Sequence, residues 1–425
     1  MRKTMGKKLV ALLILICICF ASTSCVFLSG FGNSSEQLTK EEVQQMIDNG
    51  MRGEVTVEGG DNYNITINSD NKDNVLAAKA LLSTVSINCT FKTATSSYPS
   101  GFGNTSKEKS SAGSGVIFRL DKESGDAYII TNYHVVYYNL ANTQNGISND
   151  ISVYLYGQES KEYAIPAKYI GGSMSYDLAI LKVEGSRVLA ESNAVAVEFA
   201  NSDNVAVLDK AIAVGNPENL GISATLGYIN VDSEYITMEG ADGATAIQLR
   251  VMRMDTAVNS GNSGGGLFDD SGKLIGIVNA KLTSSENMSY ALPSNFVKYV
   301  AENIIYYCDG KANEKVMRCY LGITVGANAL YTVYDTETGK VHKRESVSIA
   351  AIEATGIANG ALAVGDVINS ITIDGVKYDV TRMFVVTDSM LNARVNSVVV
   401  INVTRDGVNK DVEIKITEKS LTAML

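Results

Sequence analysis

Short apolar runs separated by Gly, Asn, Asp and Ser recur between about residues 75 and 303, and this pattern predicts strands. The helical spacing of apolar residues is clear only at 295–307, which we expect to close this part of the chain. Residues 90–113 are rich in Ser, Thr, Gly and Lys and are predicted to form a long loop before the first barrel strand. Evenly spaced short strands are typical of an all-β sandwich or barrel. The predicted strands contain residues 115–118, 127–130, 178–181, 211–214 and 274–278.

The last hundred residues have a different pattern, with strands and one helix. Residues 398–403 and 412–416 alternate in polarity on either side of the turn Arg405-Asp406-Gly407. Residues 382–391 have apolar positions at helical spacing. The sequence therefore predicts a second, mixed domain from about residue 314.

The segment before residue 75 is predicted to be a tether with little core of its own. Thr39 and Glu42 have the spacing of a capping box, so a short helix is expected at 39–49. Residues 55–57 and 63–67 alternate around Gly and Asp residues and predict a hairpin. One helix and one hairpin are too small for a catalytic unit.

The amino terminus has the three-part pattern of a secretory signal peptide. Basic residues are followed by an apolar run at 9–20, which is too short to span a bilayer comfortably. Small residues then lead to Cys25, and this order resembles a bacterial lipobox, in which the cysteine is lipidated and cleavage falls just before it. Ser22 stands where that pattern prefers Leu. Lipidation at Cys25 is the prediction; plain cleavage and an uncleaved anchor are the alternatives.

Composition narrows the possible functions. The 425 residues include 36 Lys and Arg against 46 Asp and Glu, so the net charge of −10 does not suit a nucleic-acid partner. Two histidines, His134 and His342, are too few for a His-rich metal site. We expect neither a metal nor an organic cofactor.

The cysteines suggest no metal site either. Cys89, Cys308 and Cys319 stay in the mature chain with Cys25 and show no CxxC spacing. We expect them to be small, partly buried apolar residues. Pairing of Cys308 with Cys319 is left open.

Three residues have the properties that acyl transfer needs. Ser263 lies in the turn Gly261-Asn262-Ser263-Gly264-Gly265, where a hydroxyl is exposed and backbone amides can face a developing oxyanion. His134 follows the predicted strand 127–130, and Asp177 begins the apolar run 178–181. A carboxylate beside aliphatic residues needs hydrogen bonds, and bonding to an imidazole would fix the histidine tautomer. His342 lies in a polar, basic stretch and is expected to be an exposed surface residue.

The order His, Asp, Ser and the motifs around these residues resemble the HtrA-type (Deg-type) envelope serine proteases. These have a trypsin-like domain followed by PDZ domains. The motifs that carry the resemblance are Ser111-Ala112-Gly113-Ser114-Gly115-Val116, Thr131-Asn132-Tyr133-His134-Val135, Tyr176-Asp177-Leu178-Ala179, Ala213-Val214-Gly215-Asn216-Pro217 and Asp255-Thr256-Ala257-Val258-Asn259-Ser260-Gly261-Asn262-Ser263-Gly264-Gly265.

The resemblance implies a role for each matched position. His134 would be the general base, Asp177 its orienting acid and Ser263 the nucleophile, with an oxyanion hole from the amides of Gly261, Asn262 and Ser263. The pocket for the residue before the cleaved bond would be lined by Val258, Ala280, Lys281 and Leu282. This wall is mostly aliphatic, which implies small or medium apolar side chains, although Lys281 departs from the family's usual apolar residue.

The C-terminal part resembles a PDZ domain. Tyr320-Leu321-Gly322-Ile323 matches the loop and strand whose amides receive a peptide carboxylate, and Gly365-Asp366-Val367-Ile368 matches a core strand. The helix expected at 382–391 would form the other wall of a groove that takes a peptide C-terminus by β-augmentation. Residues 324–346 depart from the family as a longer insertion.

The resemblance as a whole implies a mostly β fold with a two-barrel trypsin-like protease domain and a PDZ-like α+β domain. The expected segments are a signal peptide (1–24), a tether (25–74), the protease domain (75–308) and the PDZ-like domain (314–420). The expected function is an envelope-associated serine endopeptidase that cleaves unfolded or mislocalised extracytoplasmic proteins, forms homotrimers, and is tethered to the outer face of the cytoplasmic membrane. The alternatives are a non-catalytic chaperone or peptide-binding scaffold on a protease fold, and an esterase with the same machinery.

Overall fold

The computed structural model describes residues 72–93, 107–143, 145–279 and 288–424. Contacts divide the chain into two units, Met1–Asp70 and Asn71–Leu425, and every described residue belongs to the second. The predicted signal peptide, Cys25, the helix at 39–49 and the hairpin at 55–67 therefore lie outside the described residues.

The described chain begins with a helix that was not predicted, because helical spacing is clear from the sequence only at 295–307. This helix, α3 (Lys72–Ser83), contains three alanines, three leucines and two lysines. These residues favour a helix because they lose little side-chain freedom in it. The helix was not recognised from the sequence because a short apolar run does not by itself distinguish a strand from a helix.

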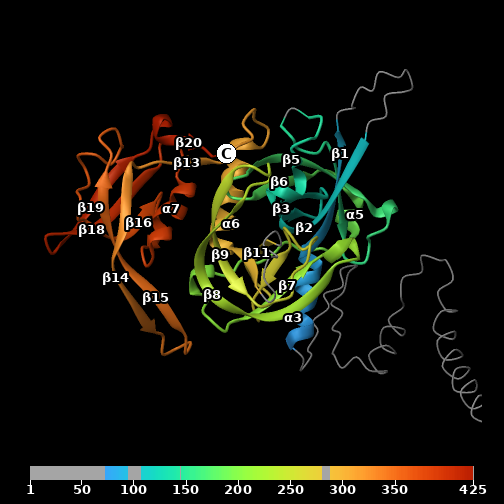
Figure 1. The fold of residues 1–425 in the computed structure, drawn as a ribbon, viewed down its shortest axis with the longest axis horizontal. Coiled ribbons are helices and arrows are strands. Elements are labelled where there is room, and N and C mark those ends of the chain that lie inside the picture. Colours follow the sequence, from blue (N-terminus) through green and yellow to red (C-terminus); the bar gives the residue numbers. More distant parts are fainter. Residues whose placement is uncertain (1–71, 94–106, 144, 280–287, 425) are drawn as a thin grey trace, which may run out of the picture. The chain divides into compact units, whose positions relative to one another are not determined.

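The first six strands close into a barrel in the order β1-β2-β3-β6-β5-β4 (Figure 1). The predicted strands at 115–118, 127–130 and 178–181 are confirmed. The loop predicted at 90–113 is wrong in part, because β1 continues to Thr93 and β2 begins at Lys107, and the two strands pair over ten residues. The strands are β1 (Thr84–Thr93), β2 (Lys107–Asp121), β3 (Asp126–Thr131), β4 (Asp150–Leu155), β5 (Ile165–Ser173) and β6 (Leu178–Val183), with short helices α4 (Tyr133–Val136) and α5 (Arg187–Glu191).

The next six strands close into a second barrel in the order β10-β11-β12-β9-β8-β7. The predicted strands at 211–214 and 274–278 are confirmed, and the predicted helix at 295–307 is α6 (Ser294–Cys308). The two-barrel architecture expected from the resemblance is therefore present. The strands are β7 (Lys210–Gly215), β8 (Ser223–Glu239), β9 (Ala246–Met254), β10 (Gly266–Phe268), β11 (Leu274–Asn279) and β12 (Ser289–Pro293).

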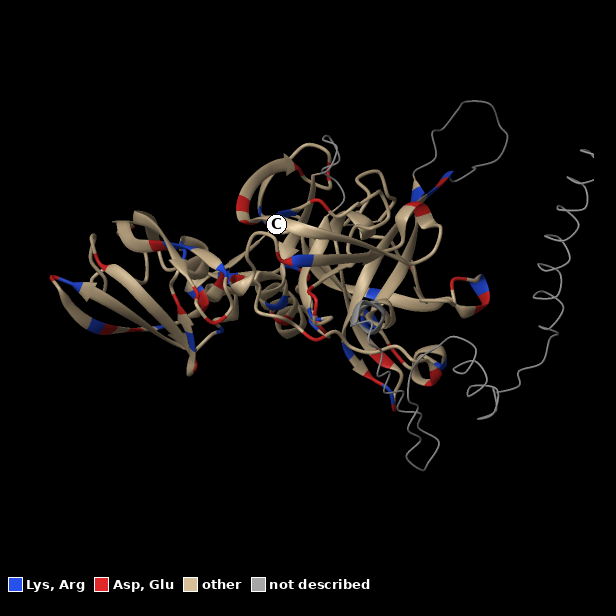
Figure 2. Ribbon diagram, turned by 90° about the horizontal axis from the view of Figure 1, so that it is seen from below, with Lys and Arg blue, Asp and Glu red and all other residues tan. Residues whose placement is uncertain are grey.

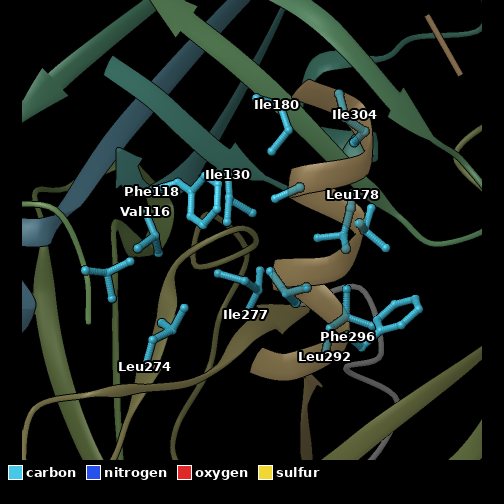
Figure 3. Packing of buried hydrophobic residues seen from close by; sticks show 14 of the residues in the cluster. Val116, Phe118, Ile130, Leu178, Ile180, Leu274, Ile277, Leu292, Phe296 and Ile304 are labelled. Carbon is cyan, nitrogen blue, oxygen red and sulfur yellow. The ribbon is translucent and has the colours of Figure 1, made fainter. Parts of the chain in front are cut away.

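One buried cluster joins the two barrels. Val116, Ile130 and Leu178 from the first barrel pack with Ile277 and Leu292 from the second. Figure 3 shows these side chains converging beside α6. Burial of each large apolar side chain contributes roughly 1.5–3 kcal/mol. The cluster thus fixes the ends of β3 and β6 relative to the turn that precedes β10.

A smaller core lies in the C-terminal region, residues 314–424, which is a further β-rich domain. Its main sheet has the order β14-β15-β16-β18-β19 (Figure 1). The predicted helix at 382–391 is α7 (Met383–Ser389), continued by the 3-10 turn η4 (Met390–Asn392). The strands are β13 (Met317–Cys319), β14 (Ile323–Tyr334), β15 (Val341–Ile352), β16 (Val367–Ile373), β17 (Val376–Asp379), β18 (Val398–Arg405), β19 (Val408–Lys415) and β20 (Leu421–Ala423).

His342 does not lie on the surface as predicted. It is 8% exposed in β15, opposite Val333 of β14. The polar neighbours in its sequence were misleading because strand alternation turns every second side chain to the other face. The three described cysteines, Cys89, Cys308 and Cys319, are buried and unpaired.

Acidic and basic residues are interspersed over both barrels and the C-terminal sheet (Figure 2). A helix long and apolar enough to cross a membrane is absent from the residues that the structure describes.

Candidate active site

Asp177 and His134 meet at the carboxyl end of β3. Antiparallel pairing sets Thr131 of β3 opposite Ala179 of β6, so the residues just beyond these positions come together. The His134 Nδ1 atom lies 2.8 Å from Asp177 Oδ2, and the His134 backbone amide donates to Asp177 Oδ1 at 3.0 Å. Because an ionised carboxylate can only accept, Nδ1 is the donor in this pair, and in the neutral imidazole Nε2 is then the acceptor.

The Asp177 carboxylate has a further donor that the sequence analysis did not identify. The Asn279 side-chain amide, at the end of β11, donates to Asp177 Oδ2 at 2.8 Å, and both residues are buried. A third contact holds the backbone, since the Asn132 side chain donates to the Asp177 carbonyl at 2.8 Å. The bonds from His134 and Asn279 offset the desolvation of the buried Asp177 carboxylate. A polar residue directly after the apolar run 274–278 was the available signal for Asn279.

The environment of the histidine leaves part of its ring accessible. The His134 side chain is 19% exposed, whereas that of Asp177 is 4% exposed. Burial raises the pKa of the neighbouring Tyr133 to about 12, so that phenol stays neutral near pH 7. The arrangement is a buried acid that orients a partly exposed imidazole.

The turn that carries Ser263 is held by both barrels. The Ser114 amide of β2 donates to the Ser263 carbonyl at 2.8 Å, and the Gly264 amide donates to Val278 of β11 at 3.0 Å. Gly264 has φ +86°, and an added Cβ would lie 2.2 Å from the Ser114 carbonyl oxygen and 3.1 Å from the Asn132 amide. Only glycine fits this close approach. The residue after Ser263 therefore packs directly against the segment that leads to His134.

A buried serine ties the turn to the first barrel from a second direction. The Ser114 hydroxyl donates to the Gly261 carbonyl at 2.8 Å and accepts from the Asn216 amide at 2.8 Å. Asn216 in turn donates to Ser86 of β1 at 2.6 Å. Ser114 and Asn216 lie within the motifs named above, but no role could be predicted for them from the sequence.

The backbone amides of the turn that carries Ser263 point in different directions. The Ser260 carbonyl accepts from the Glu218 amide at 2.7 Å. Because the C=O and N–H of a trans peptide point in opposite directions, the Gly261 amide points away from Glu218. The Asn262 amide donates to the Asn259 carbonyl at 3.1 Å. The expectation that Asn262 contributes to an oxyanion hole is therefore not supported, because that amide closes the turn instead.

The predicted specificity pocket is only partly within the described residues. Val258 lies three residues before Gly261, is half-buried and packs against the core of the second barrel. Ala280, Lys281 and Leu282 lie outside the described residues.

The predicted peptide-binding loop of the C-terminal region precedes β14. Leu321 and Gly322 are buried, and Ile323 begins the edge strand of the sheet. The Tyr320 amide donates to the Ser420 carbonyl at 2.7 Å. Tyr320 therefore cannot offer its amide to a peptide carboxylate, and that part of the prediction is corrected.

Comparison with known proteins agrees with this geometry. Residues 113–277 match the trypsin-like peptidase domain family. The Serine protease Do-like HtrA of Lactococcus lactis subsp. lactis is 28% identical over 323 residues, covering 73% of this chain and 72% of the relative. The chain is a homologue of the HtrA serine proteases. It is accordingly a serine endopeptidase with a trypsin-like peptidase domain.

Two further proteins are similar to this chain. The Serine protease Do-like HtrB of Bacillus subtilis is 35% identical over 214 residues, which cover 49% of this chain and 41% of that protein. A solved HtrA-type protease, AlgW with a tripeptide, is 24% identical and covers 82% of this chain and 96% of its own, with a TM-score of 0.49.

Proposed function

We propose that this HtrA homologue cleaves unfolded or mislocalised extracytoplasmic proteins through an acyl-enzyme at Ser263. One arrangement carries the proposal. The Asp177 carboxylate holds the His134 ring at the end of β3, and the Ser263 turn packs against the same strand end. A nucleophile, a base and an orienting acid at one place are the requirements of this chemistry.

Each group has a defined part in the reaction. The Ser263 hydroxyl attacks the peptide carbonyl carbon as His134 Nε2 takes its proton, and Asp177 stabilises the resulting imidazolium. The oxyanion accepts hydrogen bonds from the amides of Gly261 and Ser263. The imidazolium then protonates the leaving amine, and water, activated by His134, hydrolyses the ester to free the acid and regenerate Ser263.

The finer assignments follow from the HtrA resemblance. Val258, with Ala280, Lys281 and Leu282, would favour small or medium apolar residues before the cleaved bond. The C-terminal region would act as a PDZ-like domain that selects substrates or regulates cleavage, with Leu321, Gly322 and Ile323 at the ligand carboxylate. The protein would assemble as a homotrimer and be tethered outside the cytoplasmic membrane through Cys25.

An active-site-directed reagent tests the proposal directly. A fluorophosphonate probe phosphonylates a serine hydroxyl that is activated by a base, with loss of fluoride. We expect one modified tryptic peptide, containing Ser263, in the parent chain and none in His134→Ala. Labelling that is absent from the parent would contradict the proposal and favour a non-catalytic scaffold.

A further inference from the structure

Glu218 is an acidic residue beside the turn that carries Ser263. It follows β7 within the short 3-10 turn η3 (Pro217–Asn219). Its backbone amide donates to the Ser260 carbonyl at 2.7 Å, so Glu218 is held next to the peptide bond that leads to Gly261. Its side chain is exposed, and within the part of the chain that the structure describes its carboxylate has no hydrogen-bond or ion-pair partner. The site thus has a solvent-exposed negative charge next to the proposed oxyanion hole.

The backbone of this turn is strained and firmly held. Glu218 has φ +53° and Asn219 has φ +59°. Residues other than glycine are strained at such angles, and strain of this kind is kept mainly at functional sites. The Asn216 side chain closes the turn, because it accepts from the Gly221 amide at 2.8 Å and donates to Asn219 Oδ1 at 3.0 Å. The position of Glu218 is therefore fixed before a substrate binds.

The order of strands in the second barrel indicates which side of the cleaved bond Glu218 faces. β10, which follows the Ser263 turn, pairs with β11 on one side and with β7 on the other. Gly266, the first residue of β10, is opposite Ile277 near the end of β11 and opposite Val214 near the end of β7. The pocket proposed for the residue before the cleaved bond continues from β11 in the chain. The segment after β7, which contains Glu218, is therefore on the side of the leaving group.

Leu220 adds an apolar surface beside this charge. It is 81% exposed, and its amide donates to the Pro217 carbonyl at 3.1 Å, which keeps it in the same turn as Glu218. Lysine and arginine side chains combine an apolar stem with a cationic end, so they can cover Leu220 while the cation approaches the carboxylate. An extended chain advances about 3.4 Å per residue, so the first two residues after the cleaved bond lie within about 7 Å of it. These two residues are the ones that the turn can contact.

We propose that Glu218 is a specificity-determining residue that favours substrates with Lys or Arg within two residues after the cleaved bond. The proposal rests on the function proposed above, because it names the leaving group that the Ser263 site prefers. An acidic residue in the same place would be repelled by Glu218 and would lose hydration against Leu220 without gaining a partner. The preference acts on formation of the acyl-enzyme, since the amine fragment that carries the cation departs in that step.

The test is a competition among three unfolded polypeptides that contain one valine in an otherwise hydrophilic chain. They differ only in the two residues after the valine, which are Lys-Lys, Gln-Gln or Glu-Glu. The full chain is incubated with an equimolar mixture, and mass spectrometry of the amine fragments gives the ratios of kcat/KM. Glu218→Gln removes the charge and keeps the shape of the side chain, whereas Glu218→Lys reverses the charge. Glu123→Gln is the matched control, because it removes an exposed negative charge at the opposite end of β3 from His134.

We expect the parent to cleave the Lys-Lys substrate about threefold faster than the Gln-Gln substrate, the effect of an exposed ion pair, and the Glu-Glu substrate more slowly still. Glu218→Gln should bring the three rates within about 1.5-fold of one another, and Glu218→Lys should reverse their order. Glu123→Gln should keep the order of the parent. Added salt should reduce the preference of the parent, because salt screens exposed charges.

Equal cleavage of the three substrates by the parent would overturn the proposal, whether or not the variants fold. An unchanged preference in Glu218→Gln would also overturn it, because another group would then be the source. Absence of cleavage by the parent would overturn it too. Fluorophosphonate labelling of Ser263 involves no amine leaving group, so this separate readout shows whether the proposed nucleophile fails as well or still stands.

Discussion

At the scale of single residues, the site depends on the hydrogen bonds that one buried carboxylate accepts. Asp177 accepts from His134 and from Asn279, which lie on different barrels. His134, Asp177 and Ser263 could be predicted from the sequence because acyl transfer requires these residue types and because they follow in the order His, Asp, Ser. Asn279 was not, because an asparagine after an apolar strand has many possible roles and only the closed second barrel brings it to Asp177.

Asn279→Ala removes a hydrogen bond to the ionised Asp177. We expect kcat to fall by roughly 10- to 150-fold with little change in KM, since such a bond contributes about 1.5–3 kcal/mol and acts on orientation. The measurement is steady-state cleavage of an unfolded protein. The control is Asn295→Ala, which removes a surface bond to Asn201 and should leave kcat within about twofold. An unchanged kcat in Asn279→Ala would show that the amide does not orient the acid.

Asp366 gives a residue-scale prediction with a defined pH dependence. Hydrogen bonding from Arg405 lowers the pKa of Asp366, which accepts from both Nε and Nη2 at 2.6 Å. Because the folded pKa is the lower one, this stabilisation is present above the unfolded pKa of about 3.9 and is lost as the pH falls through the folded pKa.

Asp366→Asn should therefore reduce the stability of the C-terminal sheet at pH 7 by roughly 1–3 kcal/mol, and by progressively less below pH about 4. Hydrogen exchange of peptides from β16, read by mass spectrometry at several pH values, measures this loss. Asp379→Asn, which breaks an exposed pair with Lys377, is the control and should cost less than about 1 kcal/mol. Equal effects at pH 7 and pH 3 would refute the ionic explanation.

At the scale of elements, the alternation and turn signals predicted most of the barrel strands and α6. They failed where short apolar runs are ambiguous, as at α3, and where polar residues lie on a strand, as at β1 and β2. Serines and lysines at 107–111 suggested a loop, but these residues belong to β2. Pairing of β2 with β1 in the barrel provides partners for their backbone N–H and C=O groups. The turn around Ser263 likewise needs both barrels, since Ser114 bonds it from β2.

Ser114→Ala removes the hydroxyl that links the Gly261 carbonyl to the Asn216 amide. Both backbone groups would lose a partner, so we expect the rate of fluorophosphonate labelling at Ser263 to fall by about 5- to 150-fold, corresponding to about 1–3 kcal/mol. Ser148→Ala is a matched control, because that hydroxyl also donates to a carbonyl, of Thr90, and accepts from an amide, of Asp150. Equal labelling rates in the two variants would argue against a role for Ser114 in holding the turn.

At the scale of the whole molecule, the order of barrels and C-terminal sheet followed from the HtrA resemblance, whereas the contacts between distant segments did not. No local pattern indicated that the Tyr320 amide would donate to the carbonyl of Ser420, a hundred residues further along the chain. The segment bounds proposed for the signal peptide, tether, protease and PDZ-like domains stay predictions.

Cys25→Ser tests the proposed tether. If Cys25 is lipidated, the variant should lose the acyl chains and shift from the membrane fraction to the soluble fraction of disrupted cells. The measurement is fractionation followed by immunoblotting, with Cys89→Ser, a change at a buried cysteine, as the control. An unchanged membrane fraction in Cys25→Ser would favour an uncleaved signal anchor.

The central claim is that Ser263 is the nucleophile of a peptidase. The most direct measurement incubates residues 26–425, as parent and as Ser263→Ala, with unfolded casein and identifies the cleavage sites by mass spectrometry. We expect the parent to cleave, predominantly after small or medium apolar residues, and the variant to fold but not to cleave. Cleavage by Ser263→Ala at the parent's sites would show that Ser263 is not the nucleophile.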